Sequence, residues 1–433
     1  MTRQEVLKEM VAGFREDFNE ILDAVDGSEA GAVLNEETEF EVRRLALRRY
    51  AALYQSAVTL RGKEWERKPA PVCRCGSKMR MVRRMPKTVM SIVGELRFRR
   101  RQYYCEGCKT SRWPFDEEMG IAGGWTPGAV RLMTRAGAKA SFEEARTDLK
   151  EFAEMSVSHE TIRHTTEDVA HQLVAEQAAG RLLGEESSVS FDATDRAYAT
   201  MDGTSVNTLD GWREVKLGAL YDQSKAKQHY AATLEPAATF GLMLRRHAMK
   251  LQFGRAAETV AGGDGAEWIW NQTRVNFPTV DYQFLDFYHL SENVHTAARQ
   301  MYGEGSRAGG RWVQTPRHLA KHHGGRRLLQ ALQRSRRRQK KRTARDALDK
   351  LLGYVRHHLG RMAYPELQQR GIDIGTGPQE SACKNVIGRR LKGSGMRWTT
   401  ANAEAMARLR ALMYSTGSWD AFWARPHPLR KTG

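Results

Sequence analysis

The chain has 433 residues, long enough for two to four domains, and its 69 Lys and Arg against 51 Asp and Glu give a formal net charge of +18. This excess of cations favours a polyanionic partner, most simply nucleic acid. No run approaches about 18 apolar residues, and the first residues contain no apolar signal region. The sequence therefore predicts a cytoplasmic protein without a membrane segment.

The N-terminal region, residues 1–69, is predicted to be helical. Two helical stretches within residues 2–66 are interrupted around Gly27 to Asn35. The second stretch carries apolar residues among many arginines, and these are Leu45, Leu47, Tyr50, Leu53 and Tyr54. Such a helix serves either as a solvated arm or as a dimerisation element, and the pattern does not choose between the two.

Two tight cysteine pairs make residues 70–115 a candidate zinc ribbon. The pairs are Cys73 with Cys75 and Cys105 with Cys108, separated by 29 residues (105 − 75 − 1). Strand-like runs at 88–93 and 95–103 lie between them, and a hairpin that joins two cysteine turns is how a zinc ribbon forms a tetrahedral thiolate site. The first pair is C-x-C, one residue shorter than the usual C-x-x-C. The pairing predicts one bound Zn²⁺ rather than a disulfide framework.

Residues 120–180 are predicted to form three helices that resemble a helix-turn-helix. The helices begin near Pro127, near Phe142 and after Ser158, which is a good N-cap residue. The third helix either enters DNA as a recognition helix or packs in a three-helix unit without DNA contact. The side chains that it would present to DNA are His159, Arg163 and His164. Residues 178–196 follow as an acidic, Ser-containing linker.

A carboxylate stands in the next predicted element, at the start of a region that spans residues 186–289. The pattern from Tyr198 to Val206 predicts a short buried strand that ends at Asp202, followed by a turn at Gly203. Further strands are predicted at 212–221 and 229–234. An aspartate at a strand end in such a meander commonly holds a metal ion, and a turn-forming Asp-Gly pair is the alternative.

Strands and helices continue to alternate after this meander. A helix is predicted over 236–253, and a fourth strand then ends in a Gly-Asp-Gly sequence at Asp264. A helix through 268–270 follows. The fifth strand, from Tyr282, runs into the sequence Asp286-x-x-His289.

Residues 290–370 are predicted to be helical and strongly basic. Eight of the twelve positions from Arg334 to Arg345 are Lys or Arg, with no acid among them. The cations for which DNA contact is predicted are Arg334, Arg336, Arg337, Arg338, Lys340 and Lys341. A second group, placed to grip phosphates near Glu380, comprises Arg389, Arg390, Lys392 and Arg397. A solvated surface is the alternative for both groups.

The order of elements and motifs resembles a known family. The predicted elements follow the order of an RNase H-like (retroviral-integrase-like) α/β domain: three strands, a helix, a strand, a helix and a strand, and then further helices. The motifs that occur in order are Asp202-Gly-Thr, Gly211-Trp-Arg-Glu-Val-Lys-Leu-Gly218, Gly263-Asp264-Gly-Ala, Asp286-x-x-His289, Gln379-Glu380-Ser381 and Gly395-Met-Arg-Trp398. Together with the ribbon, residues 70–425 resemble bacterial insertion-sequence transposases of the Mutator-like DDE type.

The resemblance implies a catalytic site for DNA strand cleavage and transfer. Residues 186–289 and 371–433 would form the catalytic domain, and 290–370 an all-helical insertion in it. Asp202, Asp264 and Glu380 would hold two Mg²⁺ or Mn²⁺ ions, which suit hard carboxylate oxygens. Asp286 is the rival for the second ligand and otherwise supports the site, and His289 either orients DNA or packs structurally. Cys383 is expected to be a buried thiol with no catalytic part.

The resemblance also implies the partners. These are double-stranded DNA, as the terminal inverted repeats of an element and its target, and further copies of the chain in a homodimer or higher oligomer on DNA. The protein would associate with the nucleoid when bound. Two alternatives stay open: an inactive or domesticated relative that only binds DNA, and an RNase H-like nuclease or resolvase that does not transpose.

Overall fold

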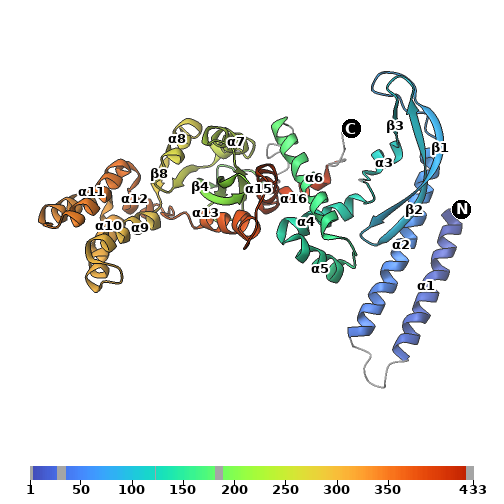
Figure 1. Cartoon of the computed structure of the whole chain (residues 1–433), viewed down its shortest axis with the longest axis horizontal. Coiled ribbons are helices and arrows are strands. Elements are labelled where there is room, and N and C mark those ends of the chain that lie inside the picture. The colour runs from blue at the N-terminus through green and yellow to red at the C-terminus, as the bar shows by residue number, and fades with distance from the viewer. Residues whose placement is uncertain (1–2, 27–35, 122, 181–188, 426–433) are drawn as a thin grey trace. The chain divides into compact units, whose positions relative to one another are not determined.

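A computed structural model describes residues 3–26, 36–121, 123–180 and 189–425 (Figure 1). The chain divides into two compact units, one of residues 1–169 with 423–433 and one of residues 170–422. The predicted break from Gly27 to Asn35 and most of the predicted acidic linker, residues 181–188, lie outside the described residues. Each unit has its own buried apolar cluster.

Two long helices open the first unit, as predicted. They are α1 (Arg3–Asp26) and α2 (Glu36–Glu66), which lie side by side at the blue end of the chain in Figure 1. The Arg49 guanidinium of α2 pairs with Asp17 of α1 and covers Gly13, where a Cβ atom would lie 1.7 Å from the Arg49 side chain. A side chain at position 13 would therefore displace the Arg49 guanidinium from its place over α1.

A long antiparallel hairpin forms the second part of this unit. Its strands are β1 (Arg80–Ser91), β2 (Gly94–Cys105) and the short β3 (Thr110–Arg112), followed by α3 (Pro114–Met119). Strands at 88–93 and 95–103 were predicted too narrowly, because β1 begins eight residues earlier and the chain turns after Ser91. Gly94, at φ +132°, occupies backbone space that glycine adopts most easily, and so ends the turn.

Three helices follow the hairpin in the chain, and the last of them continues from the first unit into residues of the second. They are α4 (Pro127–Lys139), α5 (Phe142–Ala153) and α6 (His159–Ala178), beginning where the sequence predicts them. Ser141 and Glu144 form a capping box at the start of α5, and the Ser158 hydroxyl accepts a hydrogen bond from the Thr161 N–H. Polar side chains at the expected N-caps thus fix the helix starts.

A five-stranded sheet is the centre of the second unit. Its strands are β4 (Arg196–Thr208), β5 (Gly211–Asp222), β6 (Gln228–Thr233), β7 (Glu258–Gly263) and β8 (Tyr282–Leu285), in the order β6-β5-β4-β7-β8. The first three are antiparallel, and β7 and β8 run parallel to β4. One prediction is corrected: β4 does not end at Asp202 but continues to Thr208, because the whole stretch pairs with β5.

Helices follow the sheet strands and then form a separate group. The sheet is accompanied by α7 (Ala237–Lys250), α8 (Glu267–Asn276), α13 (Gly377–Ala382), α14 (Arg389–Leu391), α15 (Thr400–Tyr414) and α16 (Ser418–Ala424). A wide helical turn over Cys383–Gly388 joins α13 to α14. The predicted helical insertion comprises α9 (Phe287–Tyr302), α10 (Arg307–Arg338), α11 (Arg342–His357) and α12 (Tyr364–Gln369), the orange elements of Figure 1. Short 3₁₀ turns occupy Phe253–Arg255 and Leu359–Arg361.

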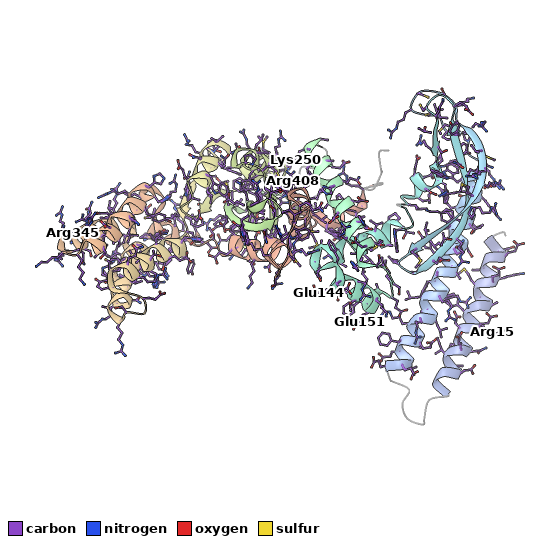
Figure 2. The ribbon with its side chains drawn as sticks, in the orientation of Figure 1. Arg15, Glu144, Glu151, Lys250, Arg345 and Arg408 are labelled. Atoms are coloured by element: carbon purple, nitrogen blue, oxygen red, sulfur yellow. The ribbon has the colours of Figure 1, made fainter. Side chains whose placement is uncertain are left out.

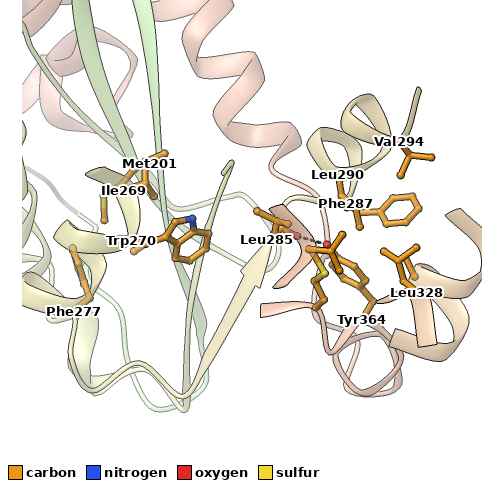
Figure 3. Packing of buried hydrophobic residues seen from close by; sticks show 14 of the residues in the cluster. Met201, Ile269, Trp270, Phe277, Leu285, Phe287, Leu290, Val294, Leu328 and Tyr364 are labelled. Carbon is orange, nitrogen blue, oxygen red and sulfur yellow. Dashed lines mark hydrogen bonds between the residues drawn. The ribbon is translucent and has the colours of Figure 1, made fainter. Parts of the chain in front are cut away.

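One apolar core joins the sheet to the helical insertion. Figure 3 shows it passing from Met201 and Ile269 through Leu285 to Phe287 and Leu328. The Tyr364 hydroxyl donates a hydrogen bond to the Leu285 carbonyl at 2.9 Å, which ties α12 to the end of β8. The insertion is therefore packed against the end of the sheet rather than tethered to it by a loop.

Candidate metal centres and nucleic-acid surface

The four paired cysteines converge in the first unit. Their Sγ atoms all lie within 4.8 Å of one another, with 3.7 Å between Cys73 and Cys108 and 3.6 Å between Cys75 and Cys105. Four thiolates at the Zn–S distance of about 2.3 Å in tetrahedral geometry stand about 3.8 Å apart, whereas a disulfide is about 2.05 Å long. The spacing matches a four-thiolate metal site.

Tight turns place these sulfurs. The Cys73 N–H donates to the Ser77 carbonyl and the Gly76 N–H to the Cys73 carbonyl, with Gly76 at φ +84°. Hydrogen bonding from Ser77 lowers the pKa of Cys75 to about 6, whereas the neighbouring Cys75 sulfur raises the pKa of Cys108 to about 12. Four thiols this close cannot all be charged without a cation among them, which is the situation that a bound metal relieves.

In the second unit, Asp202 and Asp264 stand on neighbouring parallel strands. Asp202 lies on β4 one residue beyond Met201, which pairs with Gly263, and Asp264 directly follows Gly263 at the end of β7. Burial raises the pKa of the Asp202 carboxyl, and the negative charge of Asp264 raises it further. Burial is the larger of these two causes, and a carboxylate in such surroundings is a candidate for a functional site.

The turn after Asp264 is held by local hydrogen bonds and packs against one residue of the helical insertion. Asp264 Oδ1 accepts a hydrogen bond from the Ala266 N–H at 2.7 Å, and its carbonyl accepts one from the Trp270 indole at 2.8 Å. A Cβ atom at Gly265 would lie 2.3 Å from the ring of Tyr354 on α11, so only glycine fits there. Tyr354, which no sequence motif indicated, therefore packs against the turn that holds Asp264.

Asp286 has a structural role that the sequence did not show. It is fully buried and N-caps α9, where its Oδ1 accepts from the N–H groups of Tyr288 and His289 at 2.6 and 2.9 Å. Its Oδ2 accepts from the Thr376 N–H and hydroxyl. Four hydrogen bonds use the usual acceptor positions of a carboxylate, so Asp286 ties α9 to the segment that precedes α13.

Glu380 is exposed on α13, and a neighbouring glutamine sets its place. The buried Gln379 accepts a hydrogen bond from the Thr200 hydroxyl of β4 at 3.0 Å and donates one to the Leu217 carbonyl of β5 at 2.9 Å. Ligand atoms of Asp286, His289 and Glu380 lie within 4.8 Å of one another. Among the described residues, two groups of side chains place their ligand atoms close enough to share a metal ion: the four cysteines, and Asp286 with His289 and Glu380. Asp202 and Asp264 belong to neither group.

Cys383 contacts the first carboxylate directly. Its thiol lies 3.3 Å from Asp202 Oδ2 and hydrogen bonds to it, and burial together with the Asp202 charge raises the thiol's pKa. The sequence predicted a buried thiol with no catalytic part. The structure places this half-buried thiol at the candidate site, one turn after Glu380, where it orients the Asp202 carboxylate.

The cations near α13 separate into two kinds. Arg390 is only 2% exposed, and its guanidinium carbon lies 4.9 Å from the centre of the Trp398 ring. Stacking against Trp398 keeps Arg390 from solvent, which makes it a weaker candidate for phosphate contact than its exposed neighbours. Arg389, Lys392 and Arg397 are exposed, and the Lys392 amine hydrogen bonds to Thr204 on β4, two residues after Asp202.

The basic run occupies the tip of the α10–α11 hairpin, near the Arg345 label in Figure 2. Arg336 makes a bidentate ion pair with Asp349 of α11 at 2.8 Å. Its charge is therefore paired with an acidic residue outside residues 334–345, which contain no acid of their own. The other predicted cations are exposed, namely Arg334, Arg337, Arg338, Lys340 and Lys341. The tip therefore presents a dense positive surface to solvent.

The start of α6 presents paired rather than isolated charges. Arg163 forms ion pairs with Glu160 and Glu167 of its own helix at 2.7 and 2.8 Å. His159 lies 3.4 Å from a Glu143 oxygen of α5. Phosphate contact would require these cations to exchange their carboxylate partners, which makes α6 a weaker candidate for DNA contact than the α10–α11 tip.

Comparison with known proteins does not name a relative. No protein-family model matches the chain, and no curated protein matches it either. Within the described ranges, no helix is both long and apolar enough to cross a membrane.

Proposed function

We propose that this protein is a DDE transposase, which cleaves DNA strands and transfers them with the help of bound divalent metal ions. The observation that carries the proposal is the placement of three carboxylates. Asp202 and Asp264 lie at adjacent positions of parallel strands, and Gln379 ties the helix that carries Glu380 to the same part of the sheet.

The strand order supports an RNase H-like, integrase-like domain. Three antiparallel strands lead into two strands parallel to the first, in the spatial order third, second, first, fourth and fifth. The helical insertion enters after the fifth strand, and the chain returns to the sheet through α13. The chain thus returns the helix that carries Glu380 to the strands β4 and β5, which supports the arrangement that the resemblance to Mutator-like transposases implies.

The donor set fits Mg²⁺ or Mn²⁺. Carboxylate oxygens are the ligands these ions prefer, and a bound cation would favour the charged form of the buried Asp202, whose pKa is raised by burial and, less, by the charge of Asp264. When bound, two such ions activate the attacking water or 3′-hydroxyl and stabilise the leaving oxygen. The ions would be held by Asp202, Asp264 and Glu380. Cys383 would keep the Asp202 carboxylate in place, and Asp286 would keep α9 in place. Phosphates would be contacted by Arg389 and Lys392.

The first unit and the hairpin tip would contribute DNA affinity. We propose that the four cysteines bind one Zn²⁺ in a ribbon, which fixes the strands β1 and β2. The arginine-rich faces of this ribbon and the α10–α11 tip supply positive charge for the sugar–phosphate backbone. The formal net charge of +18 supports a polyanionic substrate.

The test separates metal ligands from supporting residues. Asp202→Asn, Asp264→Asn and Glu380→Gln should each abolish cleavage of a duplex made from the DNA that flanks the gene, while binding of that duplex survives. Asp286→Asn should leave reduced but measurable cleavage, because it weakens a helix cap and a tether rather than removing a metal ligand. Mn²⁺ binding by the four variants gives the second readout.

One result would move the site. If Asp264→Asn stays fully active while Asp286→Asn is dead, the ligands are Asp286, His289 and Glu380, whose ligand atoms lie together in the structure. Strand joining, as opposed to cleavage alone, distinguishes a transposase from a nuclease with the same site. Duplex binding with neither cleavage nor joining by the unaltered protein would instead identify a protein that only binds DNA.

A further inference from the structure

An exposed apolar stripe runs along α1. Its residues are Leu7, Val11, Phe14, Phe18 and Leu22, and each leaves between 43% and 64% of its surface exposed. The steps between them are four, three, four and four residues, which place all five on one side of a helix. The contact with α2 uses a different side, through Gly13 and Asp17. The stripe is therefore not the surface that packs against α2.

The size of the stripe is that of the largest apolar patch on a typical monomer, and such patches often serve binding. Side chains of these types cover roughly 150–200 Å² each, so the exposed fractions correspond to about 500 Å² of apolar surface on one helix. Two copies that buried this area against each other would cover about 1,000 Å². This is near the lower limit for a specific, stable interface between proteins.

The charge of α1 excludes a polyanion as the partner. The helix carries Arg3, Lys8 and Arg15 against seven acidic residues, a net charge of −4 (3 − 7) within a chain of +18. DNA and anionic membranes repel such a helix, and helices that lie on membranes carry Lys and Arg on their polar face instead. A protein surface suits the stripe better. A second copy brings the same charge of −4, but none of the five residues of the stripe is charged, so the apolar seam itself does not place like charges against each other.

We propose that α1 is the homodimerisation surface of this protein, where the stripe of one copy packs against the stripe of a second copy. A seam of apolar residues at steps of three and four is self-complementary, since two identical helices related by a two-fold axis bury the same residues. Each copy contributes the hairpin of α1 and α2, so the dimer contains a four-helix bundle with the stripes at its centre. This inference does not depend on the proposed catalytic activity.

The test uses the full-length, zinc-loaded protein, freed of nucleic acid at high salt. Its mass is measured by sedimentation equilibrium between about 1 and 50 µM. The unaltered protein should approach 98.2 kDa (2 × 49.1 kDa). The double variant Val11→Glu/Phe18→Glu should stay near 49.1 kDa, with dimerisation at least about 100-fold weaker, because two carboxylates would be buried in the seam.

Phe152→Glu is the matched control, since Phe152 is 69% exposed on α5 of the same unit and outside the stripe. It should dimerise like the unaltered protein, and Val11→Ile/Phe18→Leu should as well. Circular dichroism should show equal helix content in all forms, because the substituted side chains already face solvent. A monomeric unaltered protein, or a double variant that assembles normally, overturns the proposal, as does a control that dissociates with the double variant.

Discussion

Gln379 is the side chain on which the position of Glu380 is expected to depend. It is 1% exposed, and its amide bridges the Thr200 hydroxyl and the Leu217 carbonyl on two strands. Gln379→Met keeps the length and flexibility of the side chain but removes both hydrogen bonds. The variant therefore isolates the tether from the packing.

The cost follows from the two groups left behind. Each lost bond is worth about 0.5–1.5 kcal/mol, and a buried hydroxyl and carbonyl without partners add to this, so the unfolding free energy should fall by about 3 kcal/mol. In a unit of residues 170–422, each kcal/mol lowers the melting temperature by about 2–4 °C, which gives a decrease of about 6–12 °C. Loosening Glu380 should also reduce Mn²⁺ affinity and cleavage by about 10–100-fold.

Thermal unfolding followed by circular dichroism measures the first effect, and Mn²⁺ titration the second. Glu380→Gln is the control at the adjacent position: its side chain is exposed, so the melting temperature should change by less than about 2 °C while metal binding is lost. The reasoning is refuted if Gln379→Met melts within about 2 °C of the unaltered protein, or if Glu380→Gln destabilises the fold as strongly.

Four further outcomes are expected. Cys105→Ser, or removal of metal by a chelator, should unfold residues 70–115, and elemental analysis of the unaltered protein should find one zinc per chain. Tyr354→Phe should preserve or slightly raise the melting temperature, because the buried hydroxyl has no hydrogen-bond partner among the described residues, yet lower cleavage if that hydroxyl serves the site. Burial lowers the pKa of His247 from about 6.5 to about 4, so between these pH values the unfolded chain binds a proton that the folded chain does not. The free energy of unfolding should therefore fall by up to about 3 kcal/mol as the pH is lowered from about 6.5 to about 4. His247→Gln should flatten this part of the pH profile measured by urea unfolding. Four exposed cations of the tip are to be replaced with Gln: Arg337, Arg338, Lys340 and Lys341. The slope of log K for DNA binding against log salt concentration should become shallower by about 0.9 per lost phosphate contact. Arg336→Gln alone should change this slope little, because Arg336 already pairs with Asp349.

The sequence predicted the second unit's elements well because its strands are apolar and its helices begin at recognisable residues. The strand from Gly211 to Asp222 is buried on both faces after Glu214. A continuous run of this kind predicts a buried strand from the sequence alone, without knowledge of the strands beside it. The end of β4 was missed because Gly203 after Asp202 predicts a turn, whereas pairing with Lys216 of β5 keeps the chain extended. β1 was shortened because its first half, from Arg80 to Lys87, contains three arginines, a proline and a lysine and shows no regular alternation of apolar and polar residues.

The sequence could indicate candidate ligands, but not the residues that pack around them. Asp202, Asp264 and the four cysteines stand in motifs with a characteristic spacing. The contact of Tyr354 with Gly265 joins positions 89 residues apart (354 − 265), and Arg390 lies under Trp398 only because of how α14 packs. Such relations arise from tertiary packing, and a single sequence contains no local signal for them.

The shared core of sheet and insertion limits where this protein can tolerate change in length. Because Tyr364 holds the end of β8 and Tyr354 fills the space over Gly265, deleting residues 290–370 would expose apolar side chains of the sheet and release the Asp264 turn. The insertion should therefore melt together with the sheet in one cooperative transition. The α10–α11 tip differs, since residues 340–343 are all exposed, so insertions there can lengthen or recharge the hairpin without disturbing the core.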